Sequence, residues 1–366
     1  MAVKIVRQPK KIALLGAPSS AAALAAGHER APAALRAAGI VERLTAAGFE
    51  VADHGDAAPA LFQSDEEHPR ARNIPAILRG LNDLRPRVEV ALKSGALPVI
   101  LGGDCISVLA TVAAARRYYR HVSLVYMDRD ADLNVPATTP SGCVDGMTIS
   151  QVIGRGAPEL TRFWGEPPLV REPDILLFGL DRLDPPEEQF LARSPLQRHM
   201  AQDVAALGGG AAARRALEHS HVANREFVLH FDVDVISSEE FRATNFSGPG
   251  GLKLDDARAA LAEFARQPNL IAIEFTAYNP DLDPEGQGAR MLVDLIADSL
   301  APRLSAQSTE TAPQVAAQPL AEISSATSAA AANSPASNSS ATESAPGPSE
   351  PAVNSSAPPA ADPDHP

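Results

Sequence analysis

Short apolar runs alternate with longer amphipathic segments along most of this chain. The apolar runs are nearly continuous, as is typical of strands buried on both faces of a sheet. They span residues 11–18, 97–104, 122–128, 175–180, 227–235 and 270–278. Segments with helical periodicity lie between them, at residues 31–48, 74–95, 107–119 and 255–267. This order predicts an α/β fold of three layers, α/β/α, in which helices cover both faces of a mostly parallel central sheet.

The composition changes sharply near Arg303. Beyond it, residues 304–366 are rich in Ala, Ser, Pro and Asn and contain no Lys, Arg or aromatic residue. Such a segment buries too little apolar surface to offset the entropy lost on ordering. We therefore predict one domain, residues 1–303, followed by a disordered C-terminal tail, residues 304–366.

Composition and charge narrow the functional classes. With 366 residues, of which 45% are hydrophobic, the chain is long enough for one large core. A formal net charge of −13 argues against nucleic acid and anionic membranes as partners. No run of 18 apolar residues predicts a membrane-spanning helix. Two cysteines exclude a disulfide framework, and the first apolar run is interpreted as a strand rather than a signal peptide, so we expect a cytoplasmic protein.

Six aspartates concentrate the candidate chemistry into three short segments. They are Asp128, Asp130 and Asp132, then Asp145, then Asp232 and Asp234. The first and last segments each close a predicted strand, and Gly102-Gly103-Asp104 closes another. Because the carboxyl ends of parallel strands meet at one edge of a sheet, these motifs are expected to converge on one cleft.

Carboxylates packed this closely bind cations, pair with basic side chains or take up protons. Residues i and i+2 of a strand share a face, so the aspartates in each Asp-x-Asp pair are expected to point together. Oxygen-rich sets of this kind suit Mn²⁺, Mg²⁺ or Ca²⁺. The alternative is that they are turn and cap residues. Arg129 is expected either to pair with an acid on the opposite face or to neutralise the cluster itself.

Several ordered motifs give the chain a family resemblance. GGDCIS at residues 102–107, the segment at 128–147 and FDVDV at 231–235 resemble motifs of the ureohydrolase (arginase/agmatinase) family, in particular its arginase branch. GHERAPAALR at 27–36 and GLDRLDPPEE at 179–188 extend the resemblance over roughly residues 11–300. It implies a three-layer fold, a homo-oligomer (trimer or hexamer), and hydrolysis of a guanidinium carbon by hydroxide that bridges two Mn²⁺ ions.

The resemblance also implies roles for particular residues. Four positions match the family's aspartate metal ligands: Asp128, Asp132, Asp232 and Asp234. Four others match groups that bind an amino-acid substrate: Asn134 and Ser141 at its α-carboxylate, Asp184 at its α-amino group, and Glu187 as a neighbouring acid.

The departures from the family pattern are equally specific. Cys105 and Asp130 replace two histidine metal ligands, and Asp145 replaces the histidine of the proton shuttle, which makes it the candidate catalytic residue. Ala277 stands where a glutamate holds the guanidinium, and Asp181 and Arg182 invert an Arg-Asp pair.

These replacements predict a changed metal site. Asp130 still offers an oxygen, so with Asp128, Asp232 and Asp234 it would hold one hard cation such as Mn²⁺. A second site would depend on the thiol of Cys105, a soft ligand that matches Mn²⁺ poorly. We therefore predict one occupied site rather than two, with complete loss of metal as the alternative.

Two other side chains leave alternatives open. His230 is interpreted as a strand histidine with satisfied hydrogen bonds, the alternative being a substitute metal ligand. Cys105 and Cys143 are expected near each other as unpaired residues that fill space, the alternatives being a thiolate-bound Zn²⁺ or a redox-labile pair.

Three hypotheses for the function follow. In the first, the protein lacks normal arginine hydrolysis and acts in binding or regulation, with a small amino-acid-like ligand. In the second, it is an active Mn²⁺-dependent hydrolase of a guanidino or amidine C–N bond in an arginine-like substrate. In the third, it is a structural partner that joins the oligomer of a true family member.

Overall fold

The computed structural model describes residues 5–306. The predicted tail at 304–366 lies outside these residues, apart from its first three positions, which belong to the short helix α12 (Pro302–Ala306). Among the described residues, no helix is both long and apolar enough to cross a membrane.

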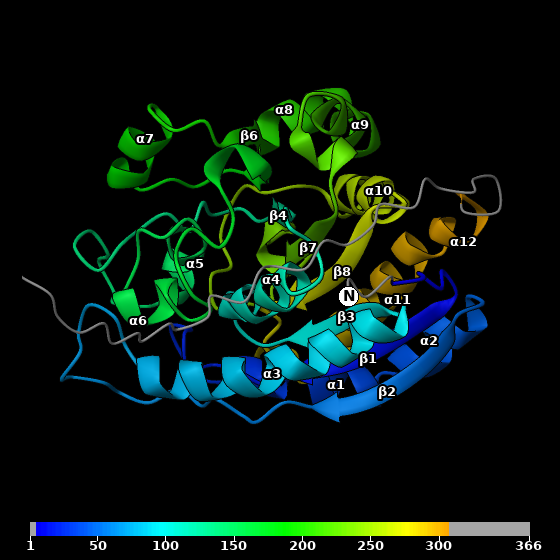
Figure 1. Ribbon diagram of the computed structural model, residues 1–366, viewed down its shortest axis with the longest axis horizontal. Coiled ribbons are helices and arrows are strands. Elements are labelled where there is room, and N and C mark those ends of the chain that lie inside the picture. Colours follow the sequence, from blue (N-terminus) through cyan, green and yellow to red (C-terminus); the bar gives the residue numbers. More distant parts are fainter. Residues whose placement is uncertain (1–4, 307–366) are drawn as a thin grey trace, which may run out of the picture. The chain divides into compact units, whose positions relative to one another are not determined.

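One eight-stranded parallel sheet forms the middle layer, in the order β2-β1-β3-β8-β7-β4-β5-β6 (Figure 1). Its strands are β1 (Lys11–Ala17), β2 (Glu50–Asp56), β3 (Leu97–Gly102), β4 (Ser123–Met127), β5 (Ile175–Leu180), β6 (Gln197–Met200), β7 (Phe227–Asp232) and β8 (Leu270–Thr276). All six strands predicted from the apolar runs are present, and the predicted parallel α/β fold is confirmed.

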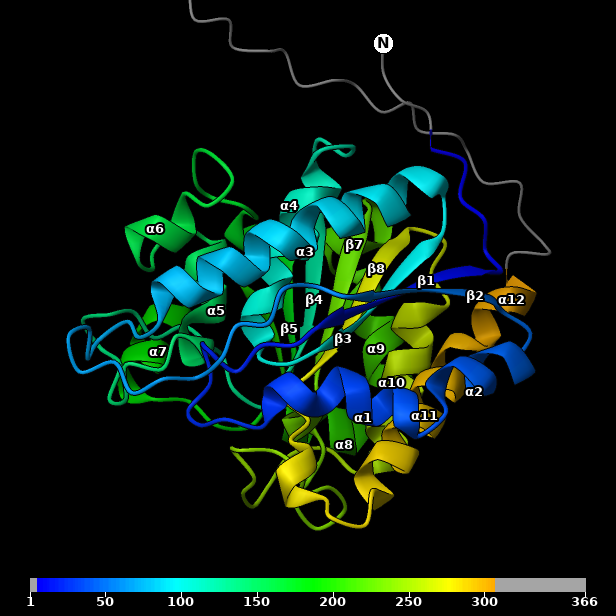
Figure 2. The same ribbon diagram turned by 90° about the horizontal axis from the view of Figure 1, so that it is seen from below.

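Helices cover both faces of this sheet, as Figure 2 shows. One face packs against α3 (Ile74–Ser94), α4 (Val108–Arg116), α5 (Thr148–Val152) and α6 (Pro158–Thr161). The other packs against α1 (Ala31–Ala37), α2 (Ile40–Ala46), α8 (Ala201–Leu207), α9 (Gly209–Glu218), α10 (Leu254–Ala265) and α11 (Gln287–Leu300). The short helix α7 (Pro185–Leu191) follows β5. Consecutive residues of a strand, such as Leu14 and Leu15 of β1, point to opposite faces of the sheet and enter different cores.

The segment with helical periodicity at residues 31–48 is helical, and it forms two helices. Gly39 separates α1 from α2 and adopts a left-handed conformation with φ of 88°. A glycine reaches this region without the steric cost that a Cβ would bring, so it allows the chain to turn between the two helices.

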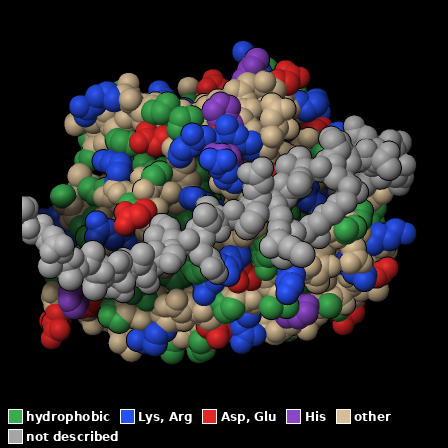
Figure 3. Space-filling view, viewed as in Figure 1, with side chains coloured by type: hydrophobic (Ala, Val, Ile, Leu, Met, Phe, Trp, Pro, Cys, Tyr) green, Lys and Arg blue, Asp and Glu red, His purple; other side chains and the backbone are tan. Residues whose placement is uncertain are grey.

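Charged side chains of both signs are spread over the face of the molecule seen in Figure 3. Lys, Arg and His side chains gather near the upper centre of this view. The excess of acidic over basic residues in the sequence therefore does not produce a continuous acidic patch on this face of the molecule.

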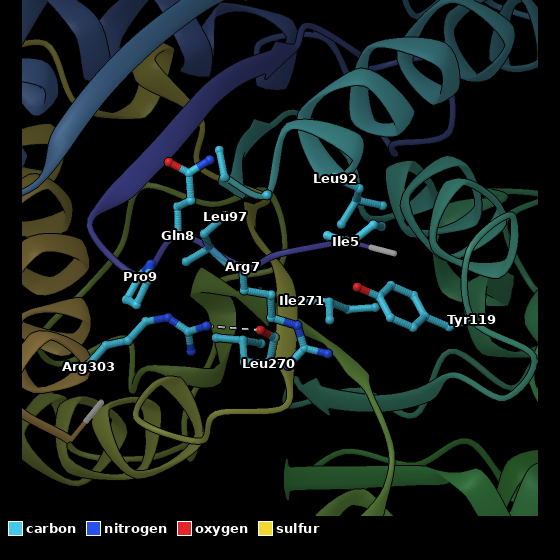
Figure 4. A pocket seen from close by; sticks show the side chains of 12 residues that line it. Ile5, Arg7, Gln8, Pro9, Leu92, Leu97, Tyr119, Leu270, Ile271 and Arg303 are labelled. Atoms are coloured by element: carbon cyan, nitrogen blue, oxygen red, sulfur yellow. Dashed lines mark hydrogen bonds between the residues drawn. The ribbon is translucent and has the colours of Figure 1, made fainter. Parts of the chain in front are cut away.

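Arg303 anchors the end of the domain from a buried position. Its guanidinium donates to the backbone oxygens of Ala265 and Gln267, at 3.1 and 2.8 Å, and of Leu270, at 3.1 Å. Figure 4 shows the side chain reaching toward Leu270, at the start of β8. Burial lowers the pKa of Arg303 to about 10, so the group stays charged at neutral pH. It thus supplies hydrogen-bond donors to the carbonyl groups at the end of α10, in the following loop and at the start of β8.

Replacing this anchor should destabilise the fold. We expect Arg303→Met to lower the free energy of unfolding by about 2–4 kcal/mol, because three carbonyl oxygens lose their donors. Urea unfolding followed by circular dichroism measures this change. The exposed Arg290 of α11 provides the control, since Arg290→Met should alter stability by less than about 0.5 kcal/mol. Equal stabilities of the two variants would show that the buried guanidinium does not anchor the end of the domain.

Candidate functional site

The carboxyl edge of the central strands surrounds a cavity of about 280 Å³. Asp128 follows β4, Asp232 ends β7, and Cys105 lies just beyond β3. The cavity is lined by Leu24, Cys105, Asp128, Asp130, Asp132, Asn134, Thr139, Pro140, Ser141, Cys143, Asp145, Gly146, Arg182, Asp184, Glu187, Asp232, Asp234 and Phe246. Every metal-ligand, catalytic and substrate-binding candidate from the sequence therefore lies on one wall or another of this cavity. Their roles stay predictions.

Tight turns, not extended strands, position the aspartates. The carboxylate of Asp128 accepts the N–H of Asp130 at 2.7 Å, and that of Asp232 accepts the N–H of Asp234 at 2.7 Å. Asp132 then adopts a left-handed backbone with φ of 51°. The expectation that alternation along a strand aims these side chains is wrong, because β4 ends at Met127 and β7 at Asp232. The first aspartate of each pair instead caps the turn that follows it.

Asp130 is held by an arginine. The Nε of Arg182 donates to Asp130 Oδ1 at 2.5 Å, and its Nη2 donates to Oδ2. Although burial opposes the shift, hydrogen bonding and attraction to Asp130 raise the pKa of Arg182, with further contributions from Asp234 and Asp128. A two-point contact of this kind is among the stronger ion pairs in proteins. The oxygens of Asp130 are therefore already used within the chain.

Five other aspartates that line the cavity have raised pKa values. Burial, followed by repulsion from neighbouring carboxylates, raises the pKa values of Asp128 and Asp232 well above 3.8. Burial likewise raises those of Asp132 and Asp145. The pKa of Asp234 rises to about 6, since burial and Asp130 outweigh the opposing charges of Arg129 and Arg182. A cation would relieve this mutual repulsion.

Among the residues that the structure describes, Arg129 has no acidic ion-pair partner, although one interpretation of the sequence expected it. Its buried side chain donates to the backbone oxygens of Gly248, at 2.8 Å, and of Phe246. Its charge nevertheless opposes the rise in the pKa of Asp234. Arg129 thus ties the loop that carries Phe246 to the end of β4, and acts on the cluster only from a distance.

Cys105 is bound to the cluster as a thiol. Its Sγ donates to Asp232 Oδ2 at 2.8 Å and lies 3.3 Å from Thr276 Oγ1, while its N–H donates to Asp145 Oδ1 at 2.7 Å. Burial and then the surrounding carboxylates raise the pKa of this thiol well above its usual value. Cys143 lines the same cavity, but its Sγ donates to the backbone oxygen of Ala22 at 2.9 Å. Both cysteines are free, as expected.

Asn134, Asp184 and Glu187, three of the four residues assigned to an amino-acid ligand, are linked to one another at the cavity. Asn134 Nδ2 donates to Asp184 Oδ2 at 2.8 Å. Both oxygens of Glu187 accept backbone N–H groups, from Leu133 and from Asp184, at 2.8 Å each. The contact with Asp184 completes a capping box at the start of α7. Glu187 therefore has a structural task that fixes the Asn134–Asp184 pair in place.

Ala277 does not line the cavity. It is buried and has a left-handed φ of 65°. Its N–H donates to the oxygen of Gly103 at 2.7 Å. The methyl group brings no acceptor for a cationic substrate to this position.

His230 has partners on both ring nitrogens, as the sequence interpretation expected. Nδ1 lies 3.1 Å from Glu274 Oε2, and Nε2 lies 3.1 Å from Thr276 Oγ1. The ring of Tyr126 stacks on it with centroids 4.3 Å apart, and the Tyr126 hydroxyl donates to Asp132. Sequence reasoning missed Tyr126, Glu274 and Thr276, because each lies in a run that otherwise reads as a buried strand.

The donors present fit one hard divalent cation. Oxygens of Asp128, Asp232 and Asp234 lie within 4.8 Å of one another, and all three residues are buried. Asp234 Oδ1 has no hydrogen-bond partner among the described residues. A buried carboxylate oxygen without a donor is what a bound cation would satisfy. A second hard cation fits poorly, because Asp130 is paired with Arg182 and Cys105 offers sulfur.

A three-layer fold with a carboxylate-lined cavity at the carboxyl edge of its parallel sheet defines a protein of the ureohydrolase class. Residues 10–301 match the family model described as the Arginase family. The chain belongs to the arginase family, which confirms the resemblance seen in its motifs.

Individual relatives agree with this assignment. The chain is 27% identical over 293 residues to an arginase of Bacillus caldovelox, covering 78% of this chain and 97% of the relative. The solved structure of an arginase from Bacillus cereus superposes with a TM-score of 0.72 at 25% identity, over 80% of this chain and 98% of that one. A formimidoylglutamase from Bacillus subtilis shares the fold, with a TM-score of 0.65 at 18% identity, over 82% and 88%.

Proposed function

We propose that this protein binds a single hard divalent cation beside an amino-acid-like ligand, and that it lacks arginine hydrolysis at the rate of the family's two-manganese enzymes. Its role is then in binding or regulation. Asp128, Asp232 and Asp234 would hold the cation, for which Mn²⁺ is the family's usual choice. A bound dication would polarise a ligand group or lower the pKa of a water molecule.

One observation carries this proposal: both positions that replace the family's histidine ligands are engaged by the protein. Arg182 holds Asp130 at two points, and Cys105 donates its thiol proton to Asp232. Freeing Asp130 requires breaking a two-point ion pair, and freeing Cys105 requires breaking a buried hydrogen bond. The donor set for a second hard cation is therefore weaker than the set for the first, and a hydroxide bridging two ions is not supported.

The ligand would be a small α-amino acid. Asn134 and Ser141 match groups that hold an α-carboxylate, and Asp184 matches the acceptor of an α-amino group. All three line the cavity. Ala277 supplies no carboxylate for a guanidinium, so the side chain of the ligand is left without the partner that arginine has in the family. A homo-oligomer, trimer or hexamer, in the cytoplasm agrees with the family and with the acidic net charge.

The second candidate function is an active metal-dependent hydrolase of an arginine-like C–N bond. The environment of Asp145 supports this second function, because burial raises the pKa of its carboxyl group well above 3.8. A carboxyl with a raised pKa holds its proton to a higher pH than an ordinary aspartate and can donate it to a leaving amine. Asp145 lines the cavity and accepts the N–H of Cys105, which fixes its position.

Two measurements separate these functions. With excess Mn²⁺ and arginine, the purified protein should release urea no faster than a variant that carries Asp232→Ala and Asp234→Ala. Elemental analysis after equilibration with Mn²⁺ should find about one ion per chain, as expected for one complete oxygen set. Sustained urea release above the variant, or two ions per chain, would refute the proposal.

A further inference from the structure

We propose that Cys105, His230 and Asp128 form a second, deeper donor set that takes a thiophilic divalent cation of the zinc class. The proposal goes beyond the function proposed above, since it adds Cys105 and His230 as ligands, shares Asp128 with the hard-cation set and names a different class of metal. One sulfur, one nitrogen and one oxygen from these residues lie within 4.8 Å of one another, and all three residues are buried.

The sheet brings these donors together from separate strands. Cys105 follows β3, His230 lies in β7 and Asp128 follows β4. Thr276 of β8, the strand between β3 and β7, joins two of them: its Oγ1 is 3.3 Å from Cys105 Sγ and 3.1 Å from His230 Nε2. Its hydroxyl therefore contacts both the thiol and the imidazole, and a cation bound to Cys105 and His230 would replace these two contacts.

The histidine is oriented as metal-binding histidines are. Its Nδ1 faces Glu274, a fully buried carboxylate that also contacts the hydroxyls of Ser107 and Thr111. A carboxylate on one ring nitrogen keeps a proton there and leaves the lone pair of the other nitrogen free for a metal. Here that nitrogen is Nε2, on the side of Cys105. The stacked ring of Tyr126 holds the plane of the imidazole.

The donor types select the metal. Zn²⁺ favours sulfur and nitrogen donors in a four-coordinate site, whereas Mn²⁺ and Mg²⁺ favour oxygen. Asp232 Oδ2, 2.8 Å from Cys105 Sγ, is close enough to complete such a set. On binding, the thiol loses the proton that it now donates to Asp232, and that proton leaves to solvent. The replacement of a histidine by Cys105 then changes the preferred metal instead of only weakening the site.

Cobalt reports directly on a thiolate ligand, because Co²⁺ bound to sulfur shows a charge-transfer band in the near ultraviolet. We expect the band when Co²⁺ is added to the metal-free full chain, and its loss when Zn²⁺ is added. Cys105→Ser should abolish the band and weaken Zn²⁺ binding by about 100-fold or more. Cys143→Ser is the matched control, since Cys143 lines the same cavity but donates to Ala22, and it should keep both.

A second variant keeps the test decisive if Cys105→Ser fails to fold. Glu274→Gln removes the charge behind His230 and should weaken Zn²⁺ binding by about tenfold while Mn²⁺ binding stays within about twofold. No cobalt band in the wild type, or a band that survives in Cys105→Ser, would overturn the proposal. Mn²⁺ stoichiometry and urea release, measured on the same samples, decide the proposed function separately.

Discussion

In the absence of divalent cations, we expect this protein to become less stable as the pH rises from 6.5 to 8.5. Burial and mutual repulsion raise the pKa values of Asp128, Asp132, Asp145 and Asp232 well above 3.8. The folded chain therefore binds these protons more tightly than the unfolded chain does. Their contribution to stability is complete below about pH 4 and is lost as the pH rises through the folded-state values.

Other titrating groups do not reverse this trend in the chosen window. Aspartates with lowered pKa values, such as Asp174, are ionised in both states by pH 6.5. His28, whose pKa burial lowers to about 4, contributes stability that grows up to about pH 6.5 and then levels off. The loss between pH 6.5 and 8.5 is about 1.4 kcal/mol per pH unit for each extra proton that the folded state holds.

Urea unfolding in EDTA at the two pH values measures the effect. Adding Mn²⁺ should narrow the difference, because the cation binds the ionised carboxylates and stabilises only the folded chain. Asp232→Asn should flatten the dependence, whereas Asp203→Asn, on the exposed side of α8, should leave it unchanged. A metal-free protein equally stable or more stable at pH 8.5 would contradict the raised pKa values.

Replacing Arg182 by glutamine should raise the affinity for Mn²⁺ by about 10- to 100-fold. The guanidinium neutralises Asp130 at two points and its charge also acts on Asp234 and Asp128. Its removal frees the Asp130 carboxylate and takes a positive charge away from the position of the cation. Either change should strengthen the attraction between the cation and its carboxylate ligands by about 1 kcal/mol or more, at separations of a few ångströms.

Isothermal titration of Mn²⁺ into the metal-free protein provides the measurement. Arg182→Lys, which keeps the charge, should bind within about threefold of the wild type. Arg215→Gln, at an exposed position of α9, controls for a general change of net charge. If Arg182→Gln bound Mn²⁺ no more tightly than Arg182→Lys, the internal arginine would not be a competitor of the metal.

The central part of the fold followed from the sequence because its strands are buried on both faces. Every residue of β3 and β5 is buried, so their apolar runs are unbroken. The edge strands gave no such signal. Strand β6 reads QRHM and is half-exposed, and β2 reads EVADHGD and is mostly exposed, because each has only one neighbour. Their place is set by pairing with the sheet rather than by local pattern.

The site residues were predictable by motif, but their partners were not. Asp130 and Arg182 are separated by 52 positions, and Glu274 and His230 by 44. No local rule connects residues so distant. Hydrogen bonds within the turns also overrode the strand periodicity at Asp130 and Asp234, because Asp128 and Asp232 each accept a backbone N–H at the end of the strand. Recognising Asp-x-Asp as a turn signal would have corrected this expectation.

The four strands that carry or support the donors, β3, β8, β7 and β4, are contiguous and lie in the interior of the sheet. Each is hydrogen-bonded on both sides, so fraying of β2 or β6 leaves their ladders intact. Their amide protons should exchange with solvent only through opening of the whole domain. Entry and exit of ions must then depend on movements of the surrounding loops, such as the one that bears Phe246, while the floor of the cavity keeps its shape.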